Sequence, residues 1–325
     1  KIFQLYDGKR LIKTEEINPK QGSMAHDKTV FSGQGLKLLN KFQKDLYVNV
    51  ISTVIKDGYL SNLGSIITFH NTTNEHELET MKIDFVSMAA HELRTPLTSI
   101  KGYLSVYMNE NKDSLTQDQY MFLNRIDIST QQLTSLVENL LNVSKIERGV
   151  FSLNLEELDW SQNIKGITAD FKNRAGEKKL QLSFTQPTIP LPLVKVDKLR
   201  INEVLSNLIS NAIDYTPNEG SISVWTELVG DEVVTYVKDT GEGIPEAALP
   251  HLFTKFFRVS GVLEQGSKGN GLGLYISKSI MDLHHGKIWV NTKVGQGSTF
   301  SFSFPILQVK KPVIATNIAP PNLSV

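Results

Sequence analysis

The chain has 325 residues, of which 40% are hydrophobic, and its 34 basic side chains balance its 34 acidic ones. We therefore expect a globular protein of about two domains, without the net field that attracts nucleic acid or an anionic membrane. Cysteine is absent, which excludes disulfides, thiolate metal sites and cysteine nucleophiles from this chain. No apolar run reaches the roughly 18 residues of a membrane-spanning helix, so we expect no membrane segment in it.

The first 70 residues predict a small α/β unit. The segments DLYVNVISTVI (45–55) and NLGSIITFHN (62–71) alternate in hydropathy or are continuously apolar, as strands are, and DGY lies between them as a turn. The residues before position 45 show no comparably clear pattern.

From about residue 74 the hydrophobic residues recur every three or four positions, which predicts a helix. They are Leu78, Met81, Phe85, Met88, Leu97, Ile100, Leu104 and Tyr107. This helix contains the segment AAHELRTPLTS (89–99). We expect Pro96 to kink the helix, because a proline ring clashes with the carbonyl group four residues earlier, here that of Glu92.

A second helix is predicted after the polar segment 109–115. Thr116 and Gln119 have the spacing of a capping box. The hydrophobic seam that follows ends near Gly149 and consists of Leu123, Ile126, Leu133, Leu136, Leu140 and Val143. The two helices would form an antiparallel hairpin, each roughly 30 residues and about 45 Å long. A lone hairpin cannot bury such a stripe, and the pattern leaves an intramolecular bundle and a homodimer equally open.

Beyond residue 150 strands and helices mix, which predicts an α/β sandwich. The expected strands lie at 151–155, 179–184, 221–228, 232–239, 287–292 and 298–304. One helix is expected over about 160–175, and another runs from its N-cap Asp197 to about 214. The proline-rich end of the chain predicts a tail.

Three glycine clusters occur in the last third of the chain: DTGEGIP (239–245), GNGLGL (269–274) and GQGSTF (295–300). Glycine permits close backbone approach, so such loops can direct N–H groups at phosphates. A turn is nevertheless the commoner reason for a single cluster, and no P-loop or dinucleotide motif is complete.

Glu203, Asn207 and Asn211 repeat every four residues and therefore share one face of the predicted helix. This row is either a solvated polar face or a set of oxygen ligands for a hard cation such as Mg²⁺.

Six segments resemble the motifs of the sensor histidine kinases of two-component systems, in the order and spacing usual for that family. They are FVSMAAHELRTPLTSI (phosphoacceptor box), NEVLSNLISNAIDYT (N box), DTGEGIP (G1), LFTKFFR (F box), GNGLGL (G2) and GQGSTF (G3). The resemblance covers about residues 78–305. A weaker similarity relates NLGSIITFHNTTNEHELE (62–79) to the closing strand of a PAS domain and its exit helix.

The resemblance implies an α+β multidomain protein. Its parts would be a PAS-like sensor segment at 1–73, a two-helix hairpin for dimerisation and phosphotransfer at 74–149, an ATP-binding α/β sandwich at 150–307 and a flexible tail at 308–325. The hairpin would form a dimeric four-helix bundle with a second copy. The sandwich would be of the Bergerat type shared with the heat-shock-90, gyrase and MutL ATPases.

For the sandwich the resemblance implies a site for ATP and Mg²⁺. Asn207 would hold Mg²⁺, with Glu203 as a second candidate ligand, and Asn211 would lie near the phosphates. Asp239 would accept a hydrogen bond from the adenine amino group, and Tyr215 would line the adenine pocket.

The glycine motifs and the F box supply the remaining candidates. Arg258, in a lid at about 253–270, would stabilise charge on the γ-phosphate in the transition state. The glycines would let the backbone approach the base and leave a helix N-terminus facing the phosphates. The further candidates are Gly241, Gly243, Ile244, Lys255, Phe257, Lys268, Gly269, Gly271, Leu272, Gly273, Leu274 and Thr299.

One position departs from the family pattern. Asp214 stands where lysine is common, which implies either weaker ATP binding or compensation by a neighbouring cation. Lys255 and Lys268 are the obvious substitutes.

The resemblance makes His91 the phosphoacceptor. Imidazole has a pKa of about 6.5, so a neutral ring nitrogen of His91 can attack the γ-phosphorus while Glu92 removes the proton of the other nitrogen. Thr95, one turn further, would orient water for dephosphorylation of a partner. A bend at Pro96 would let the hairpin expose or withdraw the histidine. The remaining histidines are expected to be solvent-facing and inert: His26, His70, His76, His251, His284 and His285.

The expected function is that of an ATP-dependent protein-histidine kinase with phosphatase activity toward its response regulator. Expected partners are a second copy of the chain, a response-regulator receiver domain whose aspartate accepts the phosphoryl group, and a small-molecule ligand of the PAS-like segment, but not nucleic acid. The alternatives are an ATP-driven conformational clamp and a non-catalytic ATP-binding scaffold. The start at Lys1 rather than Met suggests that an upstream part was removed. We expect a cytoplasmic location, either free or as the cytoplasmic part of a membrane-anchored protein.

Overall fold

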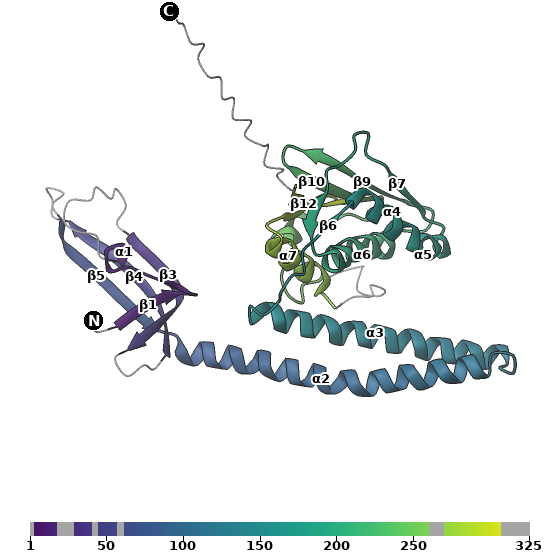
Figure 1. The fold of residues 1–325 in the computed structure, drawn as a ribbon, viewed down its shortest axis with the longest axis horizontal. Coiled ribbons are helices and arrows are strands. Elements are labelled where there is room, and N and C mark those ends of the chain that lie inside the picture. The colour runs from purple at the N-terminus through teal and green to yellow at the C-terminus, as the bar shows by residue number, and fades with distance from the viewer. Residues whose placement is uncertain (1–2, 18–28, 41–44, 57–61, 260–269, 307–325) are drawn as a thin grey trace, which may run out of the picture. The chain divides into compact units, whose positions relative to one another are not determined.

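The computed structural model describes residues 3–17, 29–40, 45–56, 62–259 and 270–306 (Figure 1). The chain divides into two compact units, Lys1–Glu92 and Leu93–Val325. The boundary falls inside one long helix, so the chain passes between the units without a loop. Several expectations lie outside the described residues: the turn at 57–59, the exposure of His26, the part of the lid at 260–269 with the roles of Lys268 and Gly269, and the tail at 308–325.

The first unit contains a five-stranded antiparallel sheet in the order β2-β1-β3-β4-β5. Its elements are β1 (Phe3–Asp7), β2 (Arg10–Leu11), α1 (Thr14–Ile17), β3 (Thr29–Asn40), β4 (Asp45–Lys56) and β5 (Asn62–Asn71). Along β4, Val48, Val50 and Ser52 are buried. Ile51, which lies between Val50 and Ser52 in the sequence, is exposed, as the two-residue period of a strand requires. The two strands predicted at 45–55 and 62–71 are confirmed.

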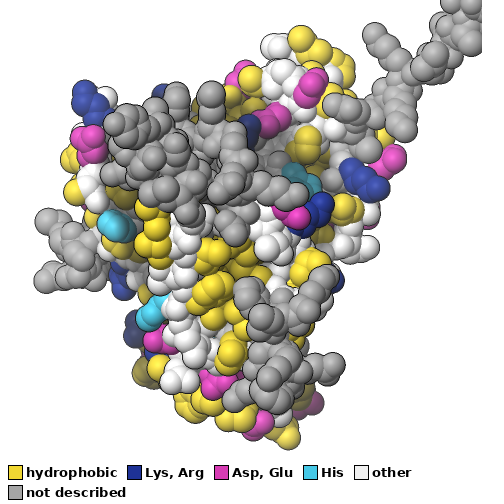
Figure 2. Space-filling model, turned by 90° about the vertical axis from the view of Figure 1, so that its left-hand side faces the viewer, with side chains coloured by type: hydrophobic (Ala, Val, Ile, Leu, Met, Phe, Trp, Pro, Cys, Tyr) yellow, Lys and Arg dark blue, Asp and Glu magenta, His cyan; other side chains and the backbone are white. Residues whose placement is uncertain are grey.

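The sequence did not predict β3, and its backbone gives the reason. The pairing of β3 with β4 shifts register between Gly33 and Leu36, so the alternation of buried and exposed residues is interrupted there. Figure 2, seen from the side of this unit, shows hydrophobic side chains at its surface. The exposed hydrophobic residues on β4 and β5 include Ile51, Ile55, Ile66 and Phe69.

The second unit begins with most of the predicted helical hairpin, formed by α2 (Thr73–Glu110) and α3 (Gln117–Glu147). The backbone N–H of Gln119 donates to the hydroxyl of Thr116 at 3.2 Å, and the N–H of Thr116 donates to the Gln119 side chain at 2.9 Å. The predicted capping box is therefore confirmed. Pro96 lies inside α2, which continues to Glu110, and the bend expected there stays a prediction.

The hairpin is held together by a narrow apolar seam and one ion pair. Leu97 and Leu104 of α2 and Val137 and Leu141 of α3 are buried. Beside them Arg94 donates to Glu138 at 2.8 Å. Most other hydrophobic residues of the two helices remain exposed, so the hairpin alone covers little of its apolar surface.

The rest of the second unit is the predicted α/β sandwich. Its elements are β6 (Glu156–Leu158), α4 (Trp160–Asp170), α5 (Lys172–Glu177), β7 (Gln181–Thr185), β8 (Val194–Val196), α6 (Lys198–Tyr215), β9 (Ser221–Val229), β10 (Glu232–Asp239), the 3₁₀ helix η1 (Glu246–His251), α7 (Gly273–Leu283), β11 (Lys287–Lys293) and β12 (Gly297–Pro305). The main sheet has the order β11-β12-β10-β9-β7, with β7 and β9 parallel. Helices α4, α6 and α7 pack on one face of it (Figure 1). Trp160, Ile209 and Phe302 are fully buried between these layers.

Most sandwich elements appear where the sequence predicts them, including the helix that Asp197 caps by accepting the N–H of Arg200 at 3.1 Å. The strand expected at 151–155 is wrong. In that segment the N–H of Asn154 donates to the carboxylate of Asp197 at 2.8 Å instead of to a strand, and the short strand β6 begins only afterwards. The single helix expected at 160–175 is divided at Phe171 into α4 and α5.

His284 is buried, so the expectation that it faces solvent is wrong. Its Nε2 accepts the backbone N–H of Asp197 at 2.9 Å, and its Nδ1 lies 2.8 Å from the carbonyl oxygen of Ile280. Burial lowers the pKa of His284 below its ordinary value, against the opposing effect of the hydrogen bond to Ile280. This histidine ties α7 to the N-cap of α6.

Candidate functional site

α2 carries the predicted phosphoacceptor residues on its solvent-exposed side. Ala90 and Leu97 are buried, whereas His91, Glu92 and Thr95 are exposed. Successive helical residues are rotated by about 100°, so His91 lies roughly a quarter of a turn around the helix from the buried Ala90. The imidazole is accessible to a large reactant, with a carboxylate as its neighbour in the sequence.

A cavity of about 1040 Å³ lies in the second unit, a size typical of ligand sites. It brings together residues from the N box, G1, the F box and G2 that are far apart in the sequence. The predicted site residues that line it are Asn207, Asn211, Tyr215, Asp239, Gly243, Ile244, Phe257, Arg258, Gly271, Gly273 and Leu274. The structure thus places most of the candidates around one volume.

Five described candidates for the ATP and Mg²⁺ site do not line the cavity: Glu203, Gly241, Lys255, Leu272 and Thr299. Gly241 contacts the cavity only through Asp239, because the N–H of Gly241 donates to the carboxylate of Asp239. Leu272 is buried in the hydrophobic core.

Asp239 is the most buried carboxylate of the cavity wall, with 5% of its surface exposed. The N–H groups of Gly241 and Ser298 donate to its Oδ1 at 2.8 and 3.1 Å. Both donors go to Oδ1, which leaves Oδ2 as the candidate acceptor for a ligand in the cavity. Burial raises the pKa of Asp239, although the two N–H donors act in the opposite direction. A buried carboxylate with one committed oxygen is suited to fix a single polar group of a ligand.

Two glycines have a steric reason to be glycine. Gly243 has φ of 72°, and a Cβ atom there would collide with the carbonyl oxygen of Lys293. A Cβ atom on Gly273 would collide with the side chain of Asn207. Gly273 is the first residue of α7, whose N-terminus has no side-chain cap. The amide of Asn207 therefore lies against a helix end whose N–H groups carry partial positive charge.

The N-box amides differ in how they are held. Asn207 donates through Nδ2 to the hydroxyl of Ser277 at 3.0 Å, which orients its Oδ1 as the remaining acceptor. Glu203 faces elsewhere: it accepts from Arg200 at 3.0 Å and from Asn142 of α3 at 3.2 Å. The row predicted at intervals of four residues is therefore divided between the cavity and the contact with α3.

Lys255 is committed to a contact outside the cavity. It forms an ion pair with Glu147 of α3 at 2.9 Å and lies 5.6 Å from the ring centroid of Tyr275. The hydroxyl of Tyr275 also donates to Glu147. Burial acts to raise the pKa of Glu147, but the hydrogen bonds from Lys255 and Tyr275 hold it below its ordinary value. Burial and the neighbouring Glu147 raise the pKa of Tyr275 to about 12.

Several cavity residues were missed by the sequence reasoning. The polar ones are Arg174 and Glu177 of α5, Ser210 of α6, Glu242, Asn270, Ser298, and the α3 residues Gln131, Gln132, Ser135 and Asn139. Ser210 could have been found, because it lies one turn from Asn207 and next to Asn211. The α5 and α3 residues could not, because only the tertiary fold brings them to the site.

Two family models match the chain. Residues 81–149 match the His Kinase A (phospho-acceptor) domain, and residues 196–308 match the histidine kinase-, DNA gyrase B- and HSP90-like ATPase. The first region contains His91, and the second contains the N box and all three glycine motifs.

The chain is similar to sensor protein SrrB of Staphylococcus aureus, with 30% identity over 271 residues, which are 81% of this chain and 46% of that protein. The chain thus spans about half the length of the curated relatives it matches. Among solved structures it is similar to full-length ShkA in complex with AMPPNP, with a TM-score of 0.57, 26% identity, and coverage of 69% of this chain and 46% of that chain.

No helix among the described residues is long and apolar enough to cross a membrane. The two domain models, the similarity to a sensor protein and the motif order agree with one another. Residues 81–149 therefore belong to the His Kinase A (phospho-acceptor) domains, and residues 196–308 to the histidine kinase-, DNA gyrase B- and HSP90-like ATPase domains.

Proposed function

We propose that this chain phosphorylates its own His91 with ATP and passes the phosphoryl group to an aspartate of a response-regulator receiver domain. The observation that carries the proposal is the pairing, in one chain, of the exposed His91 and Glu92 with a cavity lined by Asn207, Asn211 and Asp239. An exposed nucleophile can reach a nucleotide, and the cavity offers the groups that a nucleotide needs.

The residues of the cavity suit the parts of ATP. Asp239 has an oxygen for the adenine amino group, and Tyr215 and Ile244 supply apolar wall beside it. The uncapped N-terminus of α7 and Arg258 would receive the phosphates.

The donor set also suits Mg²⁺, which prefers oxygen ligands and keeps several waters. The Oδ1 of Asn207 is the first candidate, because its Nδ2 is already bound to Ser277. Glu203 would have to leave Arg200 and Asn142 to become the second ligand. When bound, the ion would neutralise charge on the β- and γ-phosphates.

In the transfer step a ring nitrogen of His91 forms a bond to the γ-phosphorus, and the bond between that phosphorus and the β–γ bridging oxygen breaks. ADP leaves with that oxygen. The proton on the other ring nitrogen passes to Glu92, so the phosphorylated imidazole ring does not keep the positive charge that the new N–P bond creates. Thr95, one turn from Glu92, would position a water molecule that attacks the phosphorus of the phosphorylated receiver domain, so that the bond from phosphorus to the aspartate oxygen breaks and inorganic phosphate is released. This gives the chain a phosphatase activity as well.

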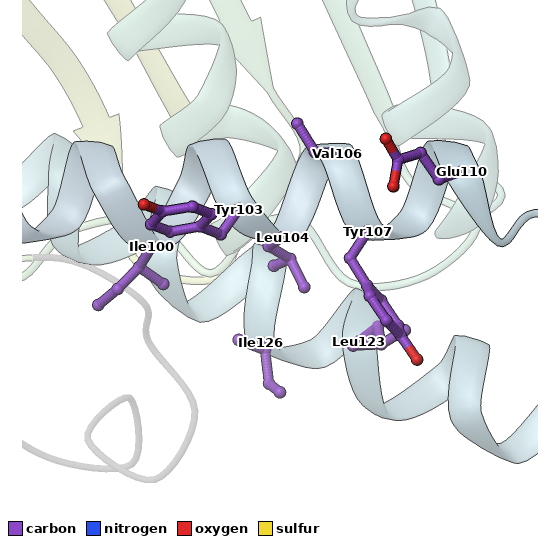
Figure 3. A pocket seen from close by; sticks show the side chains of 8 residues that line it. All are labelled: Ile100, Tyr103, Leu104, Val106, Tyr107, Glu110, Leu123 and Ile126. Carbon is purple, nitrogen blue, oxygen red and sulfur yellow. The ribbon is translucent and has the colours of Figure 1, made fainter.

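We further propose that two hairpins form a four-helix bundle. Between α2 and α3 lies an open apolar groove, in which Tyr107 of α2 points towards Leu123 of α3 while Val106 and Glu110 point away from α3 (Figure 3). Tyr103 at this groove is 79% exposed. A second copy of the hairpin, carrying the same stripe, would cover these side chains.

We retain four domains as part of the proposal: a PAS-like sensor segment at 1–73 that binds a small molecule, the hairpin at 74–149, the ATP-binding domain at 150–307 and a tail. The sheet of the first unit, whose last strand β5 leads directly into α2, supports a sensor role because a change in that strand acts on the helix that carries His91. We propose a cytoplasmic location for these parts.

The test is incubation of the purified chain with γ-labelled ATP. Label that is lost in acid and retained in alkali is expected on the wild type and on His70→Gln, a control that changes an exposed histidine of the first unit. It is expected to be absent from His91→Gln. Release of phosphate without retained label would identify an ATP-driven clamp, and binding of ATP without either reaction would identify a scaffold; both would contradict the proposal.

A further inference from the structure

The cavity carries more negative than positive side chains. The carboxylates that line it are Glu177, Asp214, Asp239 and Glu242, whereas Arg174 and Arg258 are the basic residues that line it in the described part of the chain. A nucleotide brings several negative charges into this space. The position of each cation therefore decides how well the phosphates are held.

The expected substitute for a lysine at position 214 was Lys255 or Lys268. Lys255 is bound to Glu147 and does not line the cavity, and Lys268 lies outside the described residues. The structure brings a different cation to Asp214.

That cation is Arg174 of α5. Its Nη2 donates to the Oδ1 of Asp214 at 2.8 Å, and its Nη1 donates to the hydroxyl of Ser210 at 3.0 Å. The arginine side chain is 44% exposed and that of Asp214 is 22% exposed. A guanidinium has five N–H donors, so the two bonds orient it and leave donors for a ligand.

The contact lies on the face of α6 that carries the N-box amides. Asn207, Ser210, Asn211 and Asp214 all line the cavity, and at about 100° per residue they fall within an arc of roughly 100°. A guanidinium fixed across Ser210 and Asp214 therefore lies beside both asparagines. Because the ion pair between Arg174 and Asp214 is partly exposed, it contributes little to the free energy of unfolding. A gain in stability therefore does not explain why the pair is present.

We propose that Arg174 binds the phosphates of the nucleotide and takes the place of the lysine that position 214 lacks, with Asp214 and Ser210 holding its guanidinium in position. This rests on the proposed ATP binding and identifies a residue of that same site. Arg174 comes from α5, outside the motifs that mark the family. The positive charge that a lysine at position 214 would place on α6 is thus supplied by an arginine of α5.

The experiment measures the dissociation constants of ATP with Mg²⁺, of ADP and of adenosine for the full chain. Arg174→Ala is expected to weaken ATP binding about tenfold, as the loss of a charge-assisted contact at a half-exposed position does, and to leave adenosine binding unchanged. Arg174→Lys keeps the charge and is expected to recover part of the affinity. Lys287→Ala is the matched control, because it removes a cation from an ion pair with Glu232 that does not line the cavity.

Removing Arg174 also leaves Asp214 without this ion pair, and its carboxylate would then repel the phosphates. Double variants therefore separate the loss of attraction by Arg174 from the repulsion by Asp214. In Arg174→Ala with Asp214→Asn both charges are absent, and ATP binding is expected to remain about fivefold weaker than in the wild type. In Arg174→Ala with Asp214→Lys a cation returns to the same place, and ATP affinity is expected to recover. Thermal unfolding of each variant shows whether it is folded.

Two results would overturn the inference. In the first, the doubly neutral variant binds ATP as well as the wild type, and Arg174 then serves only to neutralise Asp214. In the second, Arg174→Ala weakens adenosine as much as ATP, and its role is then structural. ATP binding by the wild type is measured first. If the wild type does not bind ATP, that result contradicts the proposed function instead.

Discussion

The helical hairpin and the C-terminal sandwich come from one chain, yet they bury their hydrophobic residues to very different extents. In the sandwich, residues such as Trp160, Ile209 and Phe302 are wholly enclosed between the sheet and its helices. In the hairpin, Ile126 is 48% exposed and Tyr103 is 79% exposed. Both regions follow a clear hydrophobic period, so the difference lies in the number of layers that each can assemble from its own residues.

The difference matches the division of labour that we propose. A closed core fixes the positions of Asp239, Asn207 and the glycine loops, which a binding site needs. A hairpin with little internal packing can change its arrangement at low cost, which suits the element that must present His91 to different reactants. Binding would therefore depend on the sandwich, and chemistry and assembly on the hairpin.

The largest expected effect separates chemistry from binding. Glu92→Gln removes the proposed proton acceptor and is expected to slow phosphorylation of His91 by about 10²- to 10⁴-fold, with an unchanged dissociation constant for ATP. Asp239→Asn should instead weaken ATP binding. Rates with saturating labelled ATP and separate binding titrations check both. Loss of ATP affinity in Glu92→Gln would contradict the division between the two regions.

The second prediction compares the same substitution in the two regions. Ile209→Ala on α6 opens a void in the closed core and is expected to lower the free energy of unfolding by about 2–5 kcal/mol. Ile126→Ala on α3 leaves a half-exposed site and is expected to cost less than about 1 kcal/mol in the monomer. Denaturant unfolding measures both. Light scattering should show that only Ile126→Ala weakens the dimer, and equal losses of stability would mean that the hairpin is better packed than its exposed residues indicate.

The third prediction concerns pH and the sandwich alone. The pKa of His284 is lowered in the folded state by burial, with Asp197 raising it and His285 lowering it further. Folding therefore favours the neutral ring. The stabilisation that it provides is present above the unfolded pKa of about 6.5 and is lost as the pH falls from there through the lowered folded value.

The test is unfolding by denaturant between pH 7.5 and pH 5, chosen as about one unit either side of the unfolded pKa. His284→Gln is expected to lose about 1–3 kcal/mol at the upper pH and to show a smaller decrease toward the lower pH than the wild type. His285→Asn removes the exposed neighbour, the last of the four causes of the shift, and should change the slope much less than His284→Gln does. An unchanged slope in His284→Gln would contradict this assignment.

The smallest expected effect lies at the start of α3. Thr116→Ala removes the side-chain half of the capping box and is expected to cost about 1 kcal/mol. Thr98→Ala, within α2, loses only a bond to the carbonyl oxygen of Arg94 and should be neutral or slightly stabilising, because alanine favours a helix interior. Helicity measured during thermal unfolding distinguishes the two variants. If Thr98→Ala lowered stability as much as Thr116→Ala, the loss could not be assigned to the helix cap.

The elements with a regular period could be predicted from the sequence, and those with an interrupted period could not. The capping box of Thr116, the cap of Asp197 and the two C-terminal hairpins depend on contacts a few residues apart, which the sequence displays directly. The segment at 151–155 has a strand-like pattern, but its Asn154 is bound by Asp197, which is distant in the sequence. Its conformation is decided by the partner, which no local pattern reveals.

The sequence by itself determined the helical hairpin, the α/β sandwich and the motif residues of the N box, G1, the F box and G2 that line the cavity, because motifs with fixed spacing sit on helices and turns of fixed geometry. Only the tertiary structure decided how the charges pair. It pairs Lys255 with Glu147 and Arg174 with Asp214. Charged side chains are long and meet across elements, so their partners depend on packing between helices rather than on the order of residues along any one of them.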